Sequence, residues 1–287
     1  MNSKFSISQQ SHQVWLITGS SSGLGRSLAQ AALAKGYRVV ATARQPEKLD
    51  KLALQYPQTL KTIRLEVTNP NEVRDVVATA ISVFGRIDVL VNNAGYGLVG
   101  ALEELSPEQI RHNFETMVFG SIAMMQAVLP IMRQQQRGHI VNMSSVVGFS
   151  NRPGFSVYGG AKYALEAISE GLQVEVAHLG IRVTIVAPGP FRTDFFGRSL
   201  VQSQNSIAAY QSTSGKFRGY ISQNQGSESG DPDKAAQVII QVVESENPPL
   251  RIVLGKYAYR RFRQKLESLT NDLNSWEVVA TSTDFED

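Results

Sequence analysis

The chain has 287 residues, no cysteine, 28 lysines and arginines against 25 aspartates and glutamates, and a formal net charge of +3. This length supports a sizeable core, and the absence of cysteine excludes disulfides, cysteine-ligated metals and a thiol nucleophile. The small charge gives no reason to expect a nucleic-acid partner. Because the N-terminus lacks a signal-peptide core and no run reaches the roughly 20 apolar residues of a membrane span, we expect a cytoplasmic protein without a membrane helix.

Short runs rich in β-branched residues alternate with helical patterns along the chain. Strands that are apolar nearly throughout and separated by helices indicate a parallel sheet covered on both faces, so the predicted fold class is α/β. The predicted strands are residues 14–18, 37–43, 59–67, 87–92, 139–143, 182–187 and 250–254. The predicted helices are residues 24–35, 71–84, 107–135, 157–178 and 232–243.

Two of these helices have clear starting signals. In Ser106-Pro107-Glu108-Gln109 the serine is suited to cap the helix, proline to its first position, and glutamine to the return bond of a capping box. Asp231-Pro232 predicts a second helix start of the same kind.

The composition changes in residues 197–230, which are dominated by Ser, Gln, Gly and Asn with three aromatic residues among them. Such a segment is either a disordered linker or a mobile substrate loop, and its aromatic residues favour the loop. Near the C-terminus, residues 256–265 are basic and residues 277–287 are acidic. There we expect a solvated helix and a frayed tail rather than a membrane or partner site.

The first predicted strand runs directly into Thr18-Gly19-Ser20-Ser21-Ser22-Gly23-Leu24-Gly25, and a helix follows. Glycines at such a turn let the backbone approach a pyrophosphate, and the helix N-terminus offers free N–H groups to it. The position between strand and helix makes this pattern a good candidate for a dinucleotide site.

The segment 19–23 also matches the G-x-S-x-G turn that carries the serine of many hydrolases. That hypothesis fails because only about 13 residues precede the strand, too few for the earlier strand and loop that supply an oxyanion hole. The last histidine, His178, also lies inside a predicted helix.

A second group of chemically active residues follows the fifth predicted strand. Ser145 comes directly after it, and Tyr158 and Lys162 stand one helical turn apart 13 positions further on. An ammonium group near a phenol favours the tyrosinate and is expected to lower the pKa of Tyr158 toward the working pH. Tyr158 is therefore a candidate general acid and base.

Together with the glycine turn, Asn92-Asn93-Ala94-Gly95, Ser145, Tyr158-x-x-x-Lys162 and Pro188-Gly189-Pro190 occur in the order and spacing of the short-chain dehydrogenase/reductase family. The chain resembles this family from about residue 12 to 255, and most closely its 17β-hydroxysteroid- and retinol-dehydrogenase-like branch. The resemblance implies one Rossmann domain over residues 1–287, a doubly wound parallel sheet of seven strands with helices on both faces. A substrate loop at about 191–230 and a C-terminal extension at 256–287 complete it.

The resemblance also implies hydride transfer between a nicotinamide and a carbonyl or alcohol carbon. Ser145 would polarise the substrate oxygen, Tyr158 would exchange its proton, and Lys162 would support Tyr158 and hold the ribose; no metal is needed. The residues expected to bind the cofactor are Thr18, Gly19, Ser21, Ser22, Gly23, Leu24, Gly25, Arg44, Glu66, Val67, Asn92, Ala94, Gly95, Tyr158, Lys162, Pro188, Gly189 and Thr193.

Two positions depart from the family pattern. The long central helix usually carries an Asn that holds a proton-relay water, and this chain has Met117 there. A thioether cannot donate a hydrogen bond, although Asn113, one turn earlier, is a possible substitute. The alternative function is therefore a non-catalytic NADP(H)-binding sensor. The second departure is that Glu66-Val67 replaces the Asp-Val expected against the adenine.

The end of the second predicted strand reads Ala41-Thr42-Ala43-Arg44. Sites that prefer NAD place an acid there, where it binds both ribose hydroxyls. With no acid present and Arg44 available to pair with a 2′-phosphate, we expect NADP(H) to be preferred over NAD(H).

An aromatic, largely uncharged surround is expected for the substrate, which indicates a small hydrophobic carbonyl compound or alcohol. By analogy with the family, the helices over residues 107–135 and 157–178 could pair in a homodimer or homotetramer. The residues expected to frame the substrate are Ser145, Tyr96, Phe149, Phe155, Phe191, Phe195 and Phe196.

Overall fold

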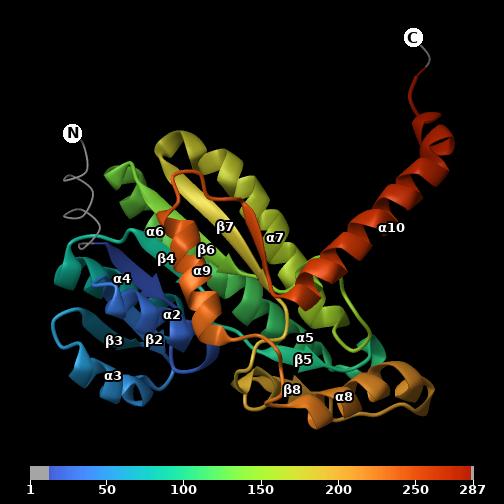
Figure 1. Ribbon diagram of the computed structural model, residues 1–287, viewed down its shortest axis with the longest axis horizontal. Coiled ribbons are helices and arrows are strands. Elements are labelled where there is room, and N and C mark those ends of the chain that lie inside the picture. The colour runs from blue at the N-terminus through green and yellow to red at the C-terminus, as the bar shows by residue number, and fades with distance from the viewer. Residues whose placement is uncertain (1–12, 286–287) are drawn as a thin grey trace.

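The computed structural model describes residues 13–285. Its main sheet has seven parallel strands in the order β3-β2-β1-β4-β6-β7-β9, and all seven were predicted (Figure 1). The order reverses at β1, which pairs with both β2 and β4. The strands are β1 (Val14–Ile17), β2 (Arg38–Ala43), β3 (Leu60–Arg64), β4 (Val89–Asn92), β6 (Gly138–Met143), β7 (Ile181–Pro188) and β9 (Arg251–Leu254).

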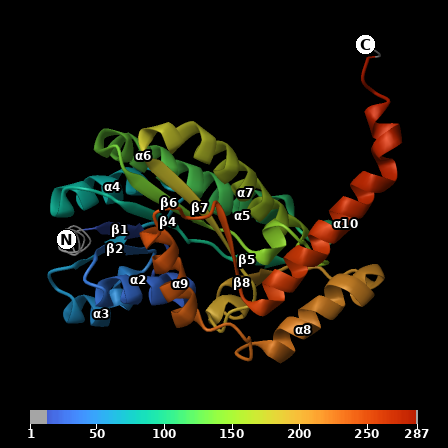
Figure 2. The same ribbon diagram turned by 45° about the horizontal axis from the view of Figure 1, so that its top comes forward.

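Helices cover both faces of this sheet, which confirms the predicted doubly wound α/β fold (Figures 1 and 2). One face is covered by α2 (Gly23–Ala34), α3 (Asp50–Gln55) and α9 (Pro232–Glu244). The other is covered by α4 (Pro70–Phe84), α6 (Gly120–Gln135) and α7 (Ser156–Val176). Because side chains alternate along a strand, Trp15 packs on the first face and Leu16 on the second, and both are fully buried.

Both predicted helix starts are confirmed. The Ser106 hydroxyl accepts a hydrogen bond from the Gln109 amide at 3.2 Å, and the Gln109 side chain accepts one from the Ser106 amide at 3.0 Å. The Asp231 carboxylate accepts from the amides of Asp233 and Lys234. These bonds satisfy N–H groups that the first turn of a helix leaves without partners.

The helix predicted over residues 107–135 is not continuous. It consists of α5 (Pro107–Phe114), a π-helical turn η3 (Glu115–Phe119) and α6. Periodicity did not reveal this turn because a π turn adds one residue without breaking the run of apolar residues. The whole stretch is also long and apolar enough to cross a membrane. Its apolar residues nevertheless pack on the sheet, as in the core helix of a folded domain.

Residues 197–230 contain regular structure that their composition concealed. β8 (Leu200–Gln202) pairs in parallel with β5 (Gly97–Val99), and α8 (Lys216–Asn224) follows. The helix is held by buried Phe217 and by Arg218, whose guanidinium lies 2.9 Å from the Glu104 carboxylate. The segment is therefore not a disordered linker, and two of its residues, Ser199 and Tyr220, line the cavity at which a substrate loop was expected.

The C-terminal extension also differs from its prediction. A single helix, α10 (Lys256–Thr281), runs through the basic stretch and into the acidic one, where a frayed tail was expected. Figures 1 and 2 show that it leaves the body of the protein and projects outward.

His139 of β6 carries a pH-dependent part of the fold's stability. The Thr184 hydroxyl donates its proton to the Pro249 carbonyl at 3.0 Å. The same hydroxyl lies 2.9 Å from Nε2 of His139, so it accepts a hydrogen bond from that nitrogen of the neutral imidazole. Burial, with a contribution from Arg182, lowers the pKa of His139 to about 4.

In the unfolded chain His139 has a pKa of about 6.5. Between pH 4 and pH 6.5 the imidazole is therefore mostly protonated in the unfolded state and mostly neutral in the folded state. The free energy of unfolding should therefore fall by up to about 3 kcal/mol as the pH drops from 7 to 4. Chemical denaturation across this range should show a smaller fall in His139→Gln, whereas the exposed His178→Gln should behave as wild type. Equal falls in all three proteins would contradict this assignment.

Candidate active site

The carboxyl ends of the parallel strands meet at one edge of the sheet, around a cavity of about 300 Å³. Residues that directly follow the strands line it, including Arg44 after β2, Asn93 after β4, Ser144 after β6 and Gly189 after β7. Within residues 13–285, no three His, Asp or Glu side chains stand close enough together to hold a metal ion.

Most of the residues predicted from the sequence line this cavity. They come from separate elements that the chain brings to the same edge of the sheet. The predicted residues on the cavity wall are Gly19, Ser21, Ser22, Gly23, Leu24, Arg44, Glu66, Val67, Ala94, Gly95, Tyr96, Ser145, Phe155, Tyr158, Lys162, Pro188, Gly189, Phe191, Thr193, Phe195 and Phe196.

Two predicted cofactor residues lie behind the wall and hold it in place. The Thr18 hydroxyl donates to the Val91 carbonyl at 3.2 Å and accepts from the amides of Asn93 and Ala94, each at 2.9 Å. Gly25 packs against Asn93, and a Cβ at Gly25 would lie 2.5 Å from the Gly19 carbonyl oxygen. Both residues therefore position the glycine turn against the end of β4.

Asn92 and Phe149 point away from the cavity. The Asn92 amide donates to the Asn142 carboxamide oxygen at 2.8 Å inside the sheet, and the neighbouring Asn93 lines the cavity instead. Consecutive side chains at the end of β4 point to opposite sides, so Asn93, and not Asn92, faces the cavity. Phe149 stacks on Phe262 of α10 with ring centroids 4.3 Å apart, so it contacts the extension.

The glycine turn forms a cradle that fits a pyrophosphate. Gly19 has a φ of +68°, and a Cβ there would lie 2.8 Å from the Ala94 Cα, so only glycine fits. Ser22, the N-cap residue of α2, makes no side-chain capping bond. The first N–H groups of α2 and its positive dipole end therefore remain available to an anion.

Arg44 lies at the far end of this cradle. Ala43 before it is buried, and the Arg44 side chain is 77% exposed with a guanidinium nitrogen 4.0 Å from the Glu66 carboxylate. An exposed pair at this distance contributes little stabilisation, so Arg44 is free to turn toward a ligand.

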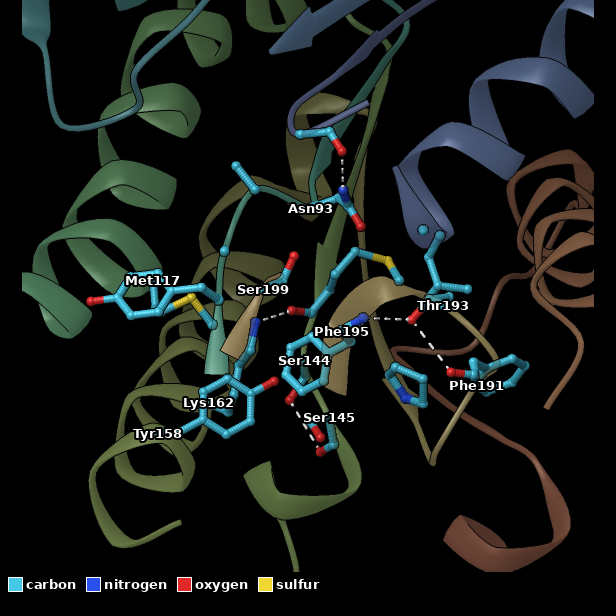
Figure 3. A pocket seen from close by; sticks show the side chains of 18 of the residues that line it. Asn93, Met117, Ser144, Ser145, Tyr158, Lys162, Phe191, Thr193, Phe195 and Ser199 are labelled. Atoms are coloured by element: carbon cyan, nitrogen blue, oxygen red, sulfur yellow. Dashed lines mark hydrogen bonds between the residues drawn. The ribbon is translucent and has the colours of Figure 1, made fainter. Parts of the chain in front are cut away.

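At the other end of the cavity, the Tyr158 ring lies close to two phenylalanine rings, one of which, Phe195, is labelled in Figure 3. Its ring centroid is 5.0 Å from that of Phe155 and 5.8 Å from that of Phe195. This burial raises the pKa of Tyr158 above its usual value, and the Ser145 hydroxyl offsets only part of the effect. The expectation that Lys162 lowers this pKa is therefore wrong: burial has the larger effect, and Tyr158 keeps its proton at neutral pH.

Lys162 is buried beside Tyr158, and its Nζ donates to the Met143 carbonyl at 2.6 Å. The ammonium lies 5.9 Å from the centroid of the Tyr158 ring. Burial lowers the pKa of Lys162 to about 7, although the negative charge of Glu166 one turn further along α7 opposes the shift. Lys162 is thus divided between its charged and neutral forms near neutral pH.

Glu166 links Lys162 to two other elements. One carboxylate oxygen accepts from the Ser144 hydroxyl at 2.6 Å, and the other accepts from the Arg251 guanidinium of β9 at 2.9 Å. Burial raises the pKa of Glu166, while the bonds from Ser144 and Arg251 oppose that rise. Sequence reasoning missed Glu166, although its place one turn after Lys162 on a helix was a usable signal.

Met117 occupies the position of the usual relay asparagine. It lines the cavity and packs so closely on Gly95 that a Cβ there would lie 2.5 Å from the Met117 sulfur. Asn113 does not take its place, because its amide is directed to the Tyr96 carbonyl at 3.4 Å. Among the described residues, the Asn113 Oδ1 is buried without a partner.

The cavity wall includes polar residues that the aromatic expectation did not foresee. Arg152 lies over the Phe217 ring, 3.9 Å from its centroid, and has no acidic partner within residues 13–285. Tyr220 of α8 and Tyr257 of α10 also line the wall. No local motif marks these residues: packing of α8 and α10 brings Tyr220 and Tyr257 to the site, and Arg152 comes from the segment between Ser145 and α7.

A substitution at Gly148 tests how tightly Ser144, Lys162 and Glu166 pack together. A Cβ at Gly148 would lie 2.5 Å from the Ser144 Oγ and 3.0 Å from both Glu166 Oε1 and the Lys162 Cβ. Gly148→Ala should lower the free energy of unfolding by about 1–3 kcal/mol through overpacking. Gly171→Ala, exposed on α7 with nothing within 4 Å, should raise it by about 0.5 kcal/mol. Denaturation that shows the same sign for both variants would contradict this packing.

With this geometry established, comparison with known proteins identifies the family. The model of the short chain dehydrogenase family matches residues 13–204. Oxidoreductase BOA17 from Botryotinia fuckeliana is 38% identical over 94% of this chain and 99% of its own length. Human retinol dehydrogenase 8 is 37% identical over 82% of this chain and 79% of its own length.

A solved structure of a short-chain dehydrogenase from Streptomyces avermitilis superposes with a TM-score of 0.88 at 43% identity. The match covers 95% of this chain and 98% of that one. This chain is therefore similar to these proteins over most of its length. It also has the sheet order, the glycine cradle and the Ser145, Tyr158 and Lys162 site described above. The chain belongs to the short-chain dehydrogenase/reductase family, in a retinol-dehydrogenase-like branch of NAD(P)-dependent oxidoreductases.

Proposed function

We propose that the protein is an NADP(H)-dependent oxidoreductase that transfers a hydride between the nicotinamide and a carbonyl or secondary alcohol carbon of a hydrophobic small molecule. The observation that carries this proposal is that Ser145, Tyr158 and Lys162 line the same cavity, with the Lys162 ammonium 5.9 Å from the centroid of the Tyr158 ring. Two hydroxyl donors on one cavity wall can hold a single carbonyl oxygen.

In the direction of reduction, the Ser145 and Tyr158 hydroxyls donate hydrogen bonds to the carbonyl oxygen and polarise the C=O bond. A nicotinamide cofactor held along the glycine cradle and beside Lys162 would supply the hydride that the carbonyl carbon gains. Tyr158 delivers its proton to the oxygen, so the carbonyl gains one hydride and one proton and becomes an alcohol. The raised pKa of Tyr158 keeps this proton on the phenol until negative charge develops on the oxygen.

Lys162 stabilises the tyrosinate that remains after this step, because its ammonium lies beside the same ring. Glu166 favours the charged form of that ammonium. The same residues operate in reverse when an alcohol is oxidised, with tyrosinate as the base.

The shape and lining of the cavity support an apolar substrate. Phe155 and Phe195 surround the reacting hydroxyl, and Tyr96 and Phe196 extend the aromatic wall. The similarity to a retinol dehydrogenase, which is named for an apolar alcohol, points in the same direction.

The proposed preference for NADP(H) rests on the end of β2. Ala43 provides no carboxylate that would repel a 2′-phosphate, and the Arg44 guanidinium is exposed at the cavity wall. Arginine pairs with phosphate through two parallel hydrogen bonds.

Replacing Tyr158 with phenylalanine tests the catalytic assignment. Because the variant lacks the proton donor, kcat for apolar ketones and aldehydes should fall about 10²- to 10⁴-fold, as followed by NADPH absorbance. NADPH affinity should change little. The control is Tyr163→Phe, whose hydroxyl bonds the Phe149 carbonyl outside the cavity, and it should keep wild-type turnover.

The same assay decides between the two candidate functions. A wild-type protein that binds NADPH tightly but reduces none of these compounds would overturn the enzyme in favour of a non-catalytic sensor. Met117 in place of the usual asparagine is the feature that makes this sensor the second candidate.

Replacing Arg44 with alanine tests the cofactor preference. The loss of a charge-assisted pair should raise KM for NADPH about 10- to 100-fold and leave KM for NADH nearly unchanged. The control is Arg64→Ala, which removes the same charge from a residue that pairs with Glu72 and does not line the cavity. An unchanged ratio of the two KM values in Arg44→Ala would refute the assignment.

A further inference from the structure

The outer part of α10 has no partner in the structure. A helix of 26 residues is about 39 Å long, and only its first turns pack on the body, through buried Ala258 and through Phe262 stacked on Phe149. Every described residue from 266 to 285 is exposed. Figures 1 and 2 show this part of the helix standing clear of all other elements.

Large apolar side chains nevertheless follow one line along this exposed part. Leu266, Leu269, Leu273 and Trp276 are spaced by three, four and three residues, and they are 53%, 38%, 73% and 65% exposed. We call these four residues the α10 stripe. The spacing is that of the a and d positions of a heptad repeat, and Phe262 continues it toward the body. A contiguous exposed apolar surface of this kind marks an interaction site.

Charge is distributed unevenly along the same helix. Its inner half carries five cationic residues and one acid, and its outer half carries only acidic charges, on both sides of the stripe. The cations are Lys256, Arg260, Arg261, Arg263 and Lys265, the inner acid is Glu267, and the outer acids are Asp272 and Glu277. Two such helices side by side in parallel would place like charges together, whereas an antiparallel pair places each basic half beside an acidic half.

We propose that the α10 stripe binds the same stripe of a second copy of this chain, with the two helices antiparallel around a twofold axis. In an antiparallel pair, a positions face d positions, so Leu266 packs against Trp276 of the second copy and Leu269 against its Leu273. The same register places Arg263 beside Glu277 of the second copy, twice by symmetry. It also sets Ala280, in the last turn of the second copy's helix, opposite Phe262.

A lipid surface fits this helix less well. A helix that lies on a membrane needs a broad apolar face and a basic polar face along its length. The α10 stripe is narrow, and the acidic outer half would be repelled by anionic lipids. The α10 stripe and the charge distribution along the helix therefore fit a second helix of the same sequence better than a membrane.

The oligomeric state in solution tests the proposal. Sedimentation at several protein concentrations should show that L269S/L273S has a smaller mass than the wild type at concentrations at which the wild type is assembled through this interface. The loss of four buried leucines per pair should raise the Kd of this interface at least about 100-fold. Because both residues are exposed and lie outside the cavity, the variant should keep wild-type reductase activity. The control is L54S, which removes an 82% exposed leucine from α3 and should leave the mass unchanged.

A charge exchange tests the antiparallel register. R263E should raise the Kd about tenfold by replacing two attractions with two repulsions, and R263E/E277R should restore it to within about threefold of wild type. A mass unaffected by L269S/L273S would overturn the proposal, and a double exchange that fails to restore binding would overturn the register. Sedimentation with phosphatidylserine-containing vesicles should show no binding; binding that L269S/L273S abolishes would assign the stripe to a membrane and overturn the proposal.

Discussion

The site depends on the parallel alignment of the sheet, which places the carboxyl ends of its strands at one edge. Each strand end then delivers its next residues to the same cavity: the glycine turn after β1, Arg44 after β2, and Ser144 with Ser145 after β6. Thr18 joins two of these ends, because its hydroxyl bonds the backbone on either side of the end of β4. A shift of one strand by one residue would reverse its side chains and dismantle the wall.

Burial then sets the protonation of the reacting groups. Burial raises the pKa of Tyr158, which keeps its proton, and lowers that of Lys162 to about 7, so that the lysine is divided between its charged and neutral forms. A neutral phenol can donate to a carbonyl oxygen, and Glu166 keeps part of the lysine charged for the tyrosinate that follows. The apolar wall that selects a hydrophobic substrate is thus also the wall that prepares the proton donor.

The sequence predicted all seven strands of the main sheet and two capped helix starts, because burial on both faces and capping are local signals. The elements that it missed depend on distant contacts. α8 is held by Phe217 and by the pairing of Arg218 with Glu104 more than a hundred residues away, and the π turn in η3 leaves the apolar pattern intact. At the site, motifs identified most of the cavity wall, whereas Tyr220 of α8 and Tyr257 of α10 reach it only through packing that no motif encodes.

Isotope transfer tests the central claim most directly, since it follows the hydride itself. NADPH deuterated at C4, in each of its two stereochemical forms, would be used to reduce an apolar ketone, and the alcohol would be analysed by mass spectrometry and NMR. The account predicts that one form delivers a single deuterium to the former carbonyl carbon and that the other delivers none, because the cradle and Tyr158 hold the reactants on one face. Deuterium from neither form, or solvent hydrogen at that carbon when the labelled form reacts, would contradict direct transfer at this site.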